Sequence, residues 1–234
     1  MLVIARVEVA PDGEVTVGIS KSADAVALVC SSDGEARRPD SIAATCAVPV
    51  GMWLDVGAEV PARSCDAGWD FVVCGPDGPV DVLAWKDTAC LVRVTAGMEG
   101  SRLRAIADLG ADAVVLSSEG LELDRISGVV ECRRVRLMSG RPVLLQVVSP
   151  LTLLQVAVLW RAGVDAIIVD AAADCKSLAA ARAVAEAAPY DLRNGEGKGS
   201  ATIGAHLAHP EEVPVEEKEE EEEEEEEGEP DEDE

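Results

Sequence analysis

The stretch Arg161–Asp170, RAGVDAIIVD, contains the signals that decide the fold. Gly163 is typical of a residue that ends a helix, and the apolar run Ala166–Val169 is typical of a strand buried on both faces. Asp170 stands where that strand would stop. Nearly the same phrase, LGADAVVLSS, occurs at residues 109–118, so the chain repeats one kind of helix-to-strand joint.

Short apolar runs of this kind recur along the chain and predict strands. They are Ala25–Cys30, Val48–Leu54, Phe71–Cys74, Leu91–Thr95, Ala113–Leu116, Val143–Val148 and Ala166–Val169. Helical patterns cover Met98–Gly110, Ser149–Gly163 and Asp174–Pro189, with Ser149 predicted as the N-cap of the second helix. Strands that alternate with helices favour a parallel sheet with right-handed crossovers.

The two repeated joints resemble those of the aldolase-type (β/α)8-barrel superfamily over roughly Ala25–Pro189. The resemblance is generic and implies a fold without a specific family. It implies an α/β barrel, abbreviated because helical patterns are weak in the first half of the chain. An eighth strand is the candidate SATIGAH, residues 200–206. A flavodoxin-like open sheet is the alternative architecture.

Three segments follow from the pattern of polarity and charge. Residues 1–20 alternate apolar and polar side chains on both sides of the turn sequence APDG, which predicts an N-terminal β-hairpin. Residues 21–210 form the barrel-like domain. Residues 211–234 hold 18 acidic residues and one lysine, which predicts a disordered acidic tail.

The bulk composition limits the classes of function. The net charge is −25 overall and −8 without residues 211–234, so binding to nucleic acid or to a membrane surface is not expected. The seven cysteines form no CxxC pair, which indicates reduced thiols and a cytoplasmic location. Apolar side chains of the predicted hairpin, such as Leu2 and Ile4, could support a homo-oligomer.

Active sites of (β/α)8 barrels lie at the carboxyl ends of the strands. The polar residues at the predicted strand ends are Ser31, Ser32, Asp55, Asp77, Thr95, Ser117–Glu119, Gln146, Ser149 and Asp170. Among them, Asp170, Glu119 and Asp55 are the candidate catalytic residues, and Asp170 with Glu119 is the candidate metal site, with Mg²⁺ as its metal. Turns also select Asp and Ser, so turn formation explains the same residues without chemistry.

Several elements of common barrel enzymes are absent from the sequence. The turn after Val169 has no glycine to wrap a phosphate, and no GxxxxGK[ST] motif occurs. The only histidines, His206 and His209, follow the predicted strands 25–169. The sequence identifies no cofactor.

Two hypotheses of function follow. The first is a non-catalytic, degenerate barrel in the cytoplasm that acts through interactions, with its acidic tail contacting basic protein partners or increasing solubility. The alternative is a small-molecule lyase or hydrolase that uses the strand-end carboxylates, with Mg²⁺ as a candidate metal. The absence of histidine from the predicted strands 25–169 and the absence of a phosphate-binding loop favour the first hypothesis. Asp55, Glu119 and Asp170 favour the second.

Overall fold

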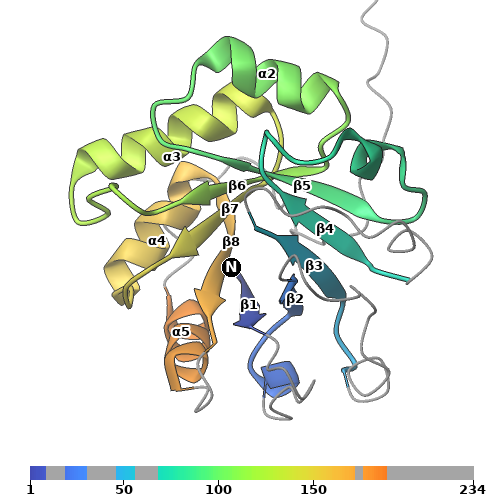
Figure 1. Ribbon diagram of the computed structural model, residues 1–234. Helices are drawn as coiled ribbons and strands as arrows, with labels where there is room; N and C mark the ends of the chain where they lie inside the picture. The colour runs from blue at the N-terminus through green and yellow to red at the C-terminus, as the bar shows by residue number, and fades with distance from the viewer. Residues whose placement is uncertain (9–18, 31–45, 56–67, 172–175, 189–234) are drawn as a thin grey trace, which may run out of the picture. The chain divides into compact units, whose positions relative to one another are not determined.

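Eight parallel strands close into a barrel in chain order (Figure 1). The computed structural model describes residues 1–8, 19–30, 46–55, 68–171 and 176–188. The strands are β1 Leu2–Glu8, β2 Ala25–Cys30, β3 Val50–Leu54, β4 Phe71–Cys74, β5 Ala89–Val94, β6 Ala113–Ser117, β7 Val143–Val147 and β8 Val164–Asp170. The predicted α/β barrel is therefore confirmed.

The seven predicted apolar runs coincide with β2 to β8, but the barrel closes differently from the sequence prediction. β1 pairs in parallel with both β2 and β8, so it is the strand that completes the barrel. This corrects the prediction that residues 2–9 form one strand of a separate hairpin. The rest of that hairpin lies mostly outside the described residues, and so does the candidate eighth strand at 200–206.

The physical reason is that β1 is buried along most of its length, as a barrel strand is. From Val3 to Ala5 every residue is buried, whichever face of the strand it occupies. Polar residues at Arg6 and Glu8 made the segment resemble a half-exposed strand. In a barrel a polar side chain can instead face the interior near the end of a strand.

Four helices belong to the described part of the chain: α2 Gly100–Asp108, α3 Ile126–Ser139, α4 Leu153–Ala162 and α5 Lys176–Ala187. Two 3-10 turns, η1 Ile19–Lys21 and η3 Val80–Ala84, precede β2 and β5. α3 was not predicted. None of the helices in the described ranges has the length and apolar character needed to cross a membrane.

The start of α4 differs from the prediction. Its N-cap is Thr152 rather than Ser149, because Thr152 and Gln155 form a capping box in which each side chain accepts a hydrogen bond from the other's backbone N–H. Its end is as predicted, since Gly163 adopts the left-handed conformation (φ 97°) that ends many helices.

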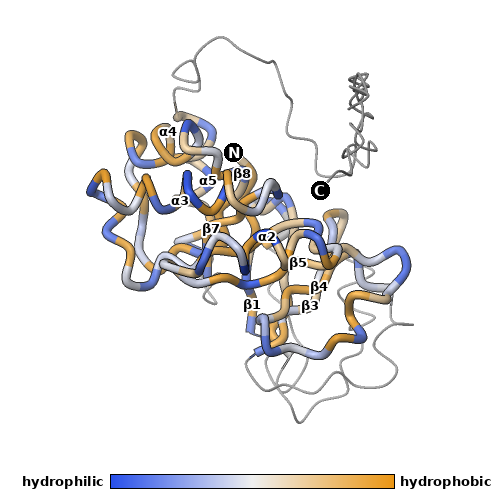
Figure 2. Tube along the Cα trace, turned by 90° about the horizontal axis from the view of Figure 1, so that it is seen from above, coloured by the Kyte–Doolittle hydropathy of each residue, from blue (hydrophilic) through white to orange (hydrophobic). Residues whose placement is uncertain are grey.

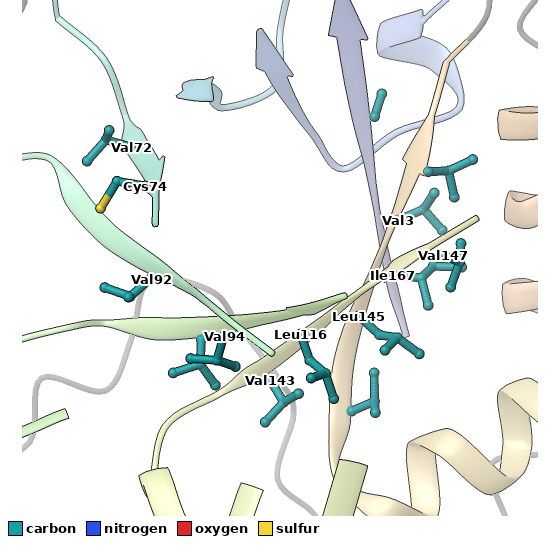
Figure 3. Packing of buried hydrophobic residues seen from close by; sticks show 14 of the residues in the cluster. Val3, Val72, Cys74, Val92, Val94, Leu116, Val143, Leu145, Val147 and Ile167 are labelled. Atoms are coloured by element: carbon teal, nitrogen blue, oxygen red, sulfur yellow. The ribbon is translucent and has the colours of Figure 1, made fainter. Parts of the chain in front are cut away.

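The helices pack on the outer surface of the barrel strands. α3 contacts β7, α4 contacts β8, and α5 contacts both β8 and β1, while consecutive helices contact each other. Buried aliphatic side chains fill the space on this outer face, and Figure 3 shows Val3, Leu116, Leu145 and Ile167 among them. The strands β3, β4 and β5 are largely hydrophobic in the tube of Figure 2, as expected for strands buried on both faces.

An aspartate stands at the amino end of each even-numbered strand and holds the preceding strand. Its carboxylate Oδ2 accepts a hydrogen bond from the backbone N–H of the first or second residue of the neighbouring odd-numbered strand. The four bonds are Val3 to Asp24 (2.8 Å), Val50 to Asp70 (2.7 Å), Cys90 to Asp112 (2.7 Å) and Val143 to Asp165 (3.0 Å). The Asp of the joint that decides the fold is thus a structural clamp between paired strands.

A second buried cluster fills the barrel interior. Its members are Ile4, Ala25, Ala27, Trp53, Phe71, Val73, Leu91, Ala113, Val115, Leu144, Ala166 and Ile168. The ring of Phe71 occupies the space where a side chain at residue 51 would lie, since a Cβ at Gly51 would be 2.2 Å from the ring. Only glycine fits at this position. The interior is therefore packed with side chains rather than hollow.

We expect Asp24→Ala to destabilise the protein by about 2 kcal/mol, because a charged acceptor of two hydrogen bonds is lost. Asp24 accepts from the backbone of Val3 at 2.8 Å and from Nη1 of Arg182 at 2.7 Å. Urea unfolding of the variant measures this loss. Asp108→Ala, at an exposed position that ends α2, is the matched control, and an equal loss in both variants would contradict the clamp.

Candidate functional site

The polar side chains of the barrel interior are concentrated at the carboxyl ends of the strands. Side chains alternate between the two faces of a strand, so each residue two positions after a member of the interior cluster also faces the pore. This rule assigns inward-facing positions to Arg6, Asp55, Arg93, Gln146 and Asp170, which follow Ile4, Trp53, Leu91, Leu144 and Ile168 by two residues. The mouth of the barrel is therefore charged above an apolar interior.

The strand registers place three of these inward positions in one layer with Trp53. In a barrel with staggered strands, one layer takes its side chains from alternate strands. Following the registers around the barrel gives Arg6 from β1, Trp53 from β3, Arg93 from β5 and Gln146 from β7. We call these four residues the mouth layer.

Trp53 connects the two arginines of the mouth layer. The guanidinium carbon of Arg6 lies 5.2 Å from the centre of the Trp53 ring, and that of Arg93 lies 5.5 Å from it. Both distances are within the range of a cation–π contact. Trp53 is 1% exposed, so the ring separates the charged mouth from the apolar layers below.

Arg6 also contacts both aspartates that lie at the rim. Its Nη1 donates to Oδ1 of Asp170 at 2.8 Å, and its Nη2 lies 3.9 Å from Oδ1 of Asp55. The Arg6 side chain is 17% exposed, whereas those of Asp170 and Asp55 are 53% and 51% exposed. The positive charge thus lies deeper in the mouth than the negative charges that balance it.

Arg93 has no such partner. Its Nη2 donates to the backbone carbonyl of Leu54 at 2.8 Å, but no carboxylate of the described residues lies within salt-bridge distance. Burial lowers the pKa of Arg93, and the nearby charge of Asp55 opposes that shift. Arg93 is therefore a partly buried cation without a direct counter-ion among the residues that the structure describes.

Three N–H groups of the mouth layer are buried and lack a hydrogen-bond acceptor among the described residues. They are Nε of Arg6, Nε of Arg93 and Nε1 of Trp53. An unpaired buried donor costs about 1–3 kcal/mol, and most buried donors in folded proteins are paired. Three unpaired donors on neighbouring side chains therefore make this layer a candidate site for a ligand that accepts hydrogen bonds.

The structure brings together two of the three predicted catalytic residues. Asp170 and Asp55 both lie beside Arg6. Glu119 is exposed beyond β6, and its carboxylate makes no ion pair or hydrogen bond with another described residue. Ser31 and Ser32 lie outside the described residues.

The described ranges hold no group of three or more His, Cys, Asp or Glu residues placed to bind a metal ion. The Arg6 guanidinium, 2.8 Å from Asp170, already balances the charge that a cation at this carboxylate would use. Metal binding by Asp170 and Glu119 stays a prediction of the sequence.

Cys74 faces away from this site, although it lies near the carboxyl end of β4. It belongs to the cluster between strands and helices, as Figure 3 shows. A hydrogen bond from Cys90 lowers the pKa of Cys74 against the effect of burial, and the same bond raises the pKa of Cys90. The two thiols are a buried pair on the outer face of the sheet.

Sequence reasoning missed Arg6 and Arg93, which carry the charge of the mouth layer. Each is the one basic residue of a mostly apolar strand, in LVIARVE and ACLVRV. A charged residue inside a strand buried on both faces is unusual, because burial of an unpaired charge is costly. The candidate residues predicted from the sequence lie where strands end and turns begin, whereas Arg6 and Arg93 lie within strands.

We expect Arg6 and Asp170 to be coupled by about 0.5–1 kcal/mol, because solvent screens the exposed carboxylate. Urea unfolding of Arg6→Met, Asp170→Ala and the double variant measures this coupling as a double-mutant cycle. Effects that simply add would show that the pair does not form in solution.

Comparison with known proteins identifies the fold of this chain and shows no family to which it belongs. No family model matches the chain, and no curated protein matches its sequence. Among solved structures, a thiamine phosphate pyrophosphorylase from Pyrococcus furiosus is 17% identical, with a TM-score of 0.54 over 79% of this chain and 96% of that chain.

Two other similar structures are synthases. A mutant tryptophan synthase α-subunit from Pyrococcus furiosus is 14% identical, with a TM-score of 0.60 over 79% of this chain and 96% of that chain. A 3-hexulose-6-phosphate synthase is 15% identical, with a TM-score of 0.54 over 80% of this chain and 99% of that chain. At these identities the likeness shows the fold alone: the chain folds as a (β/α)8 barrel.

Proposed function

We propose that this protein is an enzyme that acts on a small molecule at the mouth of its barrel, as a lyase or hydrolase in which Asp170 transfers a proton. The observation that carries the proposal is the mouth layer. The layers below it are filled with aliphatic and aromatic side chains that maximise packing. The mouth layer instead holds two arginines, and three of its buried donors have no acceptor among the residues that the structure describes.

This arrangement costs stability, because charged groups lose hydration when they are buried. Aliphatic residues at positions 6 and 93 would avoid this cost. They would pack in the barrel interior as Ile4 and Leu91 do two residues earlier on the same strands. Proteins commonly accept such a cost where a site binds or transforms a ligand. The position of the charges at the carboxyl ends of the strands is where barrel enzymes hold their active sites.

Asp170 is the residue best placed to exchange a proton with a substrate. Its Oδ1 is held by Arg6, which fixes the direction of the carboxylate. Its Oδ2 has no hydrogen-bond partner among the described residues, and the side chain is 53% exposed. A fixed carboxylate with one free oxygen at the mouth suits a general base or acid.

Arg6 and Asp55 complete the proposed machinery. Arg6 contacts both carboxylates and would stabilise negative charge that develops on a substrate near Asp170. Asp55 lies 3.9 Å from the same guanidinium and would adjust its position. The three similar solved structures described above are named as enzymes, which supports this proposal over a non-catalytic role.

The test is turnover of a defined mixture of small hydroxy acids, lactones and phosphate esters by the full chain, followed by NMR. Parallel samples contain Mg²⁺ or EDTA, which tests the predicted metal site. We expect at least one compound to be converted, and Asp170→Asn to reduce that rate by about 10²–10⁴-fold, the usual contribution of a general base or acid.

Asp108→Asn, at an exposed position of α2, is the control and should keep the rate of the wild-type protein. Urea unfolding of both variants confirms that they fold. Equal turnover by Asp170→Asn and Asp108→Asn, or conversion of no compound, would contradict the proposal.

A further inference from the structure

We infer that the mouth of the barrel binds a small oxyanion, the carboxylate or phosphate group of a substrate, between the guanidinium groups of Arg6 and Arg93 at Trp53. This inference rests on the proposed function only in taking the anion to be part of the substrate. It follows from three features of the mouth layer: unpaired donors, the depth of the positive charge, and the glycine beside Arg93.

The unpaired donors define the chemistry of the ligand. Nε of Arg6, Nε of Arg93 and Nε1 of Trp53 are all N–H groups, so the group that satisfies them must be an acceptor. The guanidinium carbons lie 5.2 and 5.5 Å from the same ring centre, and the charge of Arg6 acts on Arg93 to lower its pKa, so the two groups are neighbours in the mouth layer. Carboxylate and phosphate oxygens accept from guanidinium in short, charge-assisted bonds.

The depth of the charges favours an anion over a cation at this level of the barrel. Both cations are in the mouth layer with Trp53, whereas Asp55 and Asp170 are about half exposed at the rim. Water screens exposed carboxylates more than it screens buried guanidinium groups. Among the described residues, Arg93 has only the Leu54 carbonyl as a direct acceptor, although a guanidinium has five N–H donors.

The residue that follows β4 is a glycine, so no side chain of residue 75 covers Arg93. A Cβ at Gly75 would lie 3.5 Å from Nη2 of Arg93, so a larger side chain there would cover the guanidinium. The backbone of Gly75 does not have the positive φ that would demand glycine. The glycine at this inward position therefore leaves the guanidinium of Arg93 uncovered by a side chain from residue 75.

A purely structural role for Arg93 makes different predictions. If its purpose is to hold the Leu54 carbonyl, its removal should destabilise the protein. If it is an anion receptor, Arg93→Met should leave the melting temperature unchanged or raise it in the absence of ligand, because a partly buried charge without a counter-ion is removed. The two roles thus differ in the sign of the stability change.

The experiment is calorimetric titration of the full chain with sodium malonate and, separately, with inorganic phosphate, at constant ionic strength. We expect saturable binding of one anion or both, and the preference between them identifies a carboxylate or a phosphate as the natural group. Arg93→Met should weaken that binding by about tenfold to a hundredfold, the effect of losing a charge-assisted hydrogen bond.

Gly75→Val provides a second test that keeps every charge. It should also weaken binding at least about tenfold, since its side chain covers the guanidinium of Arg93. Arg102→Met, at an exposed position of α2, is the matched control and should bind as the wild-type protein does. Melting curves of all variants are recorded without ligand.

No saturable binding of either anion to the wild-type protein would overturn the inference, and so would unchanged binding in both Arg93→Met and Gly75→Val. Loss of stability in Arg93→Met with unchanged anion binding would assign Arg93 the structural role. Anion binding without turnover would contradict the proposed function alone. Turnover that Arg93→Met leaves unchanged would contradict the anion site alone.

Discussion

The structure depends on a hydrogen bond that an aspartate at the amino end of one strand accepts from the first or second backbone N–H of the strand before it. The bond occurs at Asp24, Asp70, Asp112 and Asp165, once for each pair of strands. A carboxylate at a strand end satisfies a donor that would otherwise lack a partner there. Because it fixes the two strand ends beside each other, it also fixes their register.

Register determines which side chains share a layer inside the barrel, and the layers determine the site. A shift by one residue would exchange the inner and outer faces of a strand. With the observed registers, the interior layers are apolar, and the space of Gly51 is filled by Phe71. The same registers bring Arg6 and Arg93 to one level around Trp53, at the end where the strands open.

The sequence predicted most of the architecture because strands buried on both faces form continuous apolar runs. All seven runs are strands, and the helix ends at Gly163 and near Gly110 are correct. β1 was misread because a polar residue within a strand was taken to face solvent, whereas Arg6 faces the pore. The start of α4 was misplaced because Ser149 and Thr152 are both good N-cap residues, and only the contact with Gln155 distinguishes them.

The candidate site was predicted in part for a related reason. Strand-end carboxylates can be found from sequence once the strands are known, and Asp55 and Asp170 do meet at one guanidinium. The guanidinium itself comes from β1, 164 residues away from Asp170 along the chain, so no local pattern connects them. Glu119 has the right residue type at a strand end, but it lies beyond the last inward position of β6.

The central claim is that the mouth layer holds a ligand rather than a permanently unpaired set of donors. Side-chain NMR of ¹⁵N-labelled protein tests it most directly, since the Nε–H resonances of Arg6 and Arg93 report on the donors themselves. The account predicts that both resonances shift together and saturably as malonate or phosphate is added, while those of exposed arginines such as Arg102 do not. Small, linear shifts shared by all arginines would contradict it.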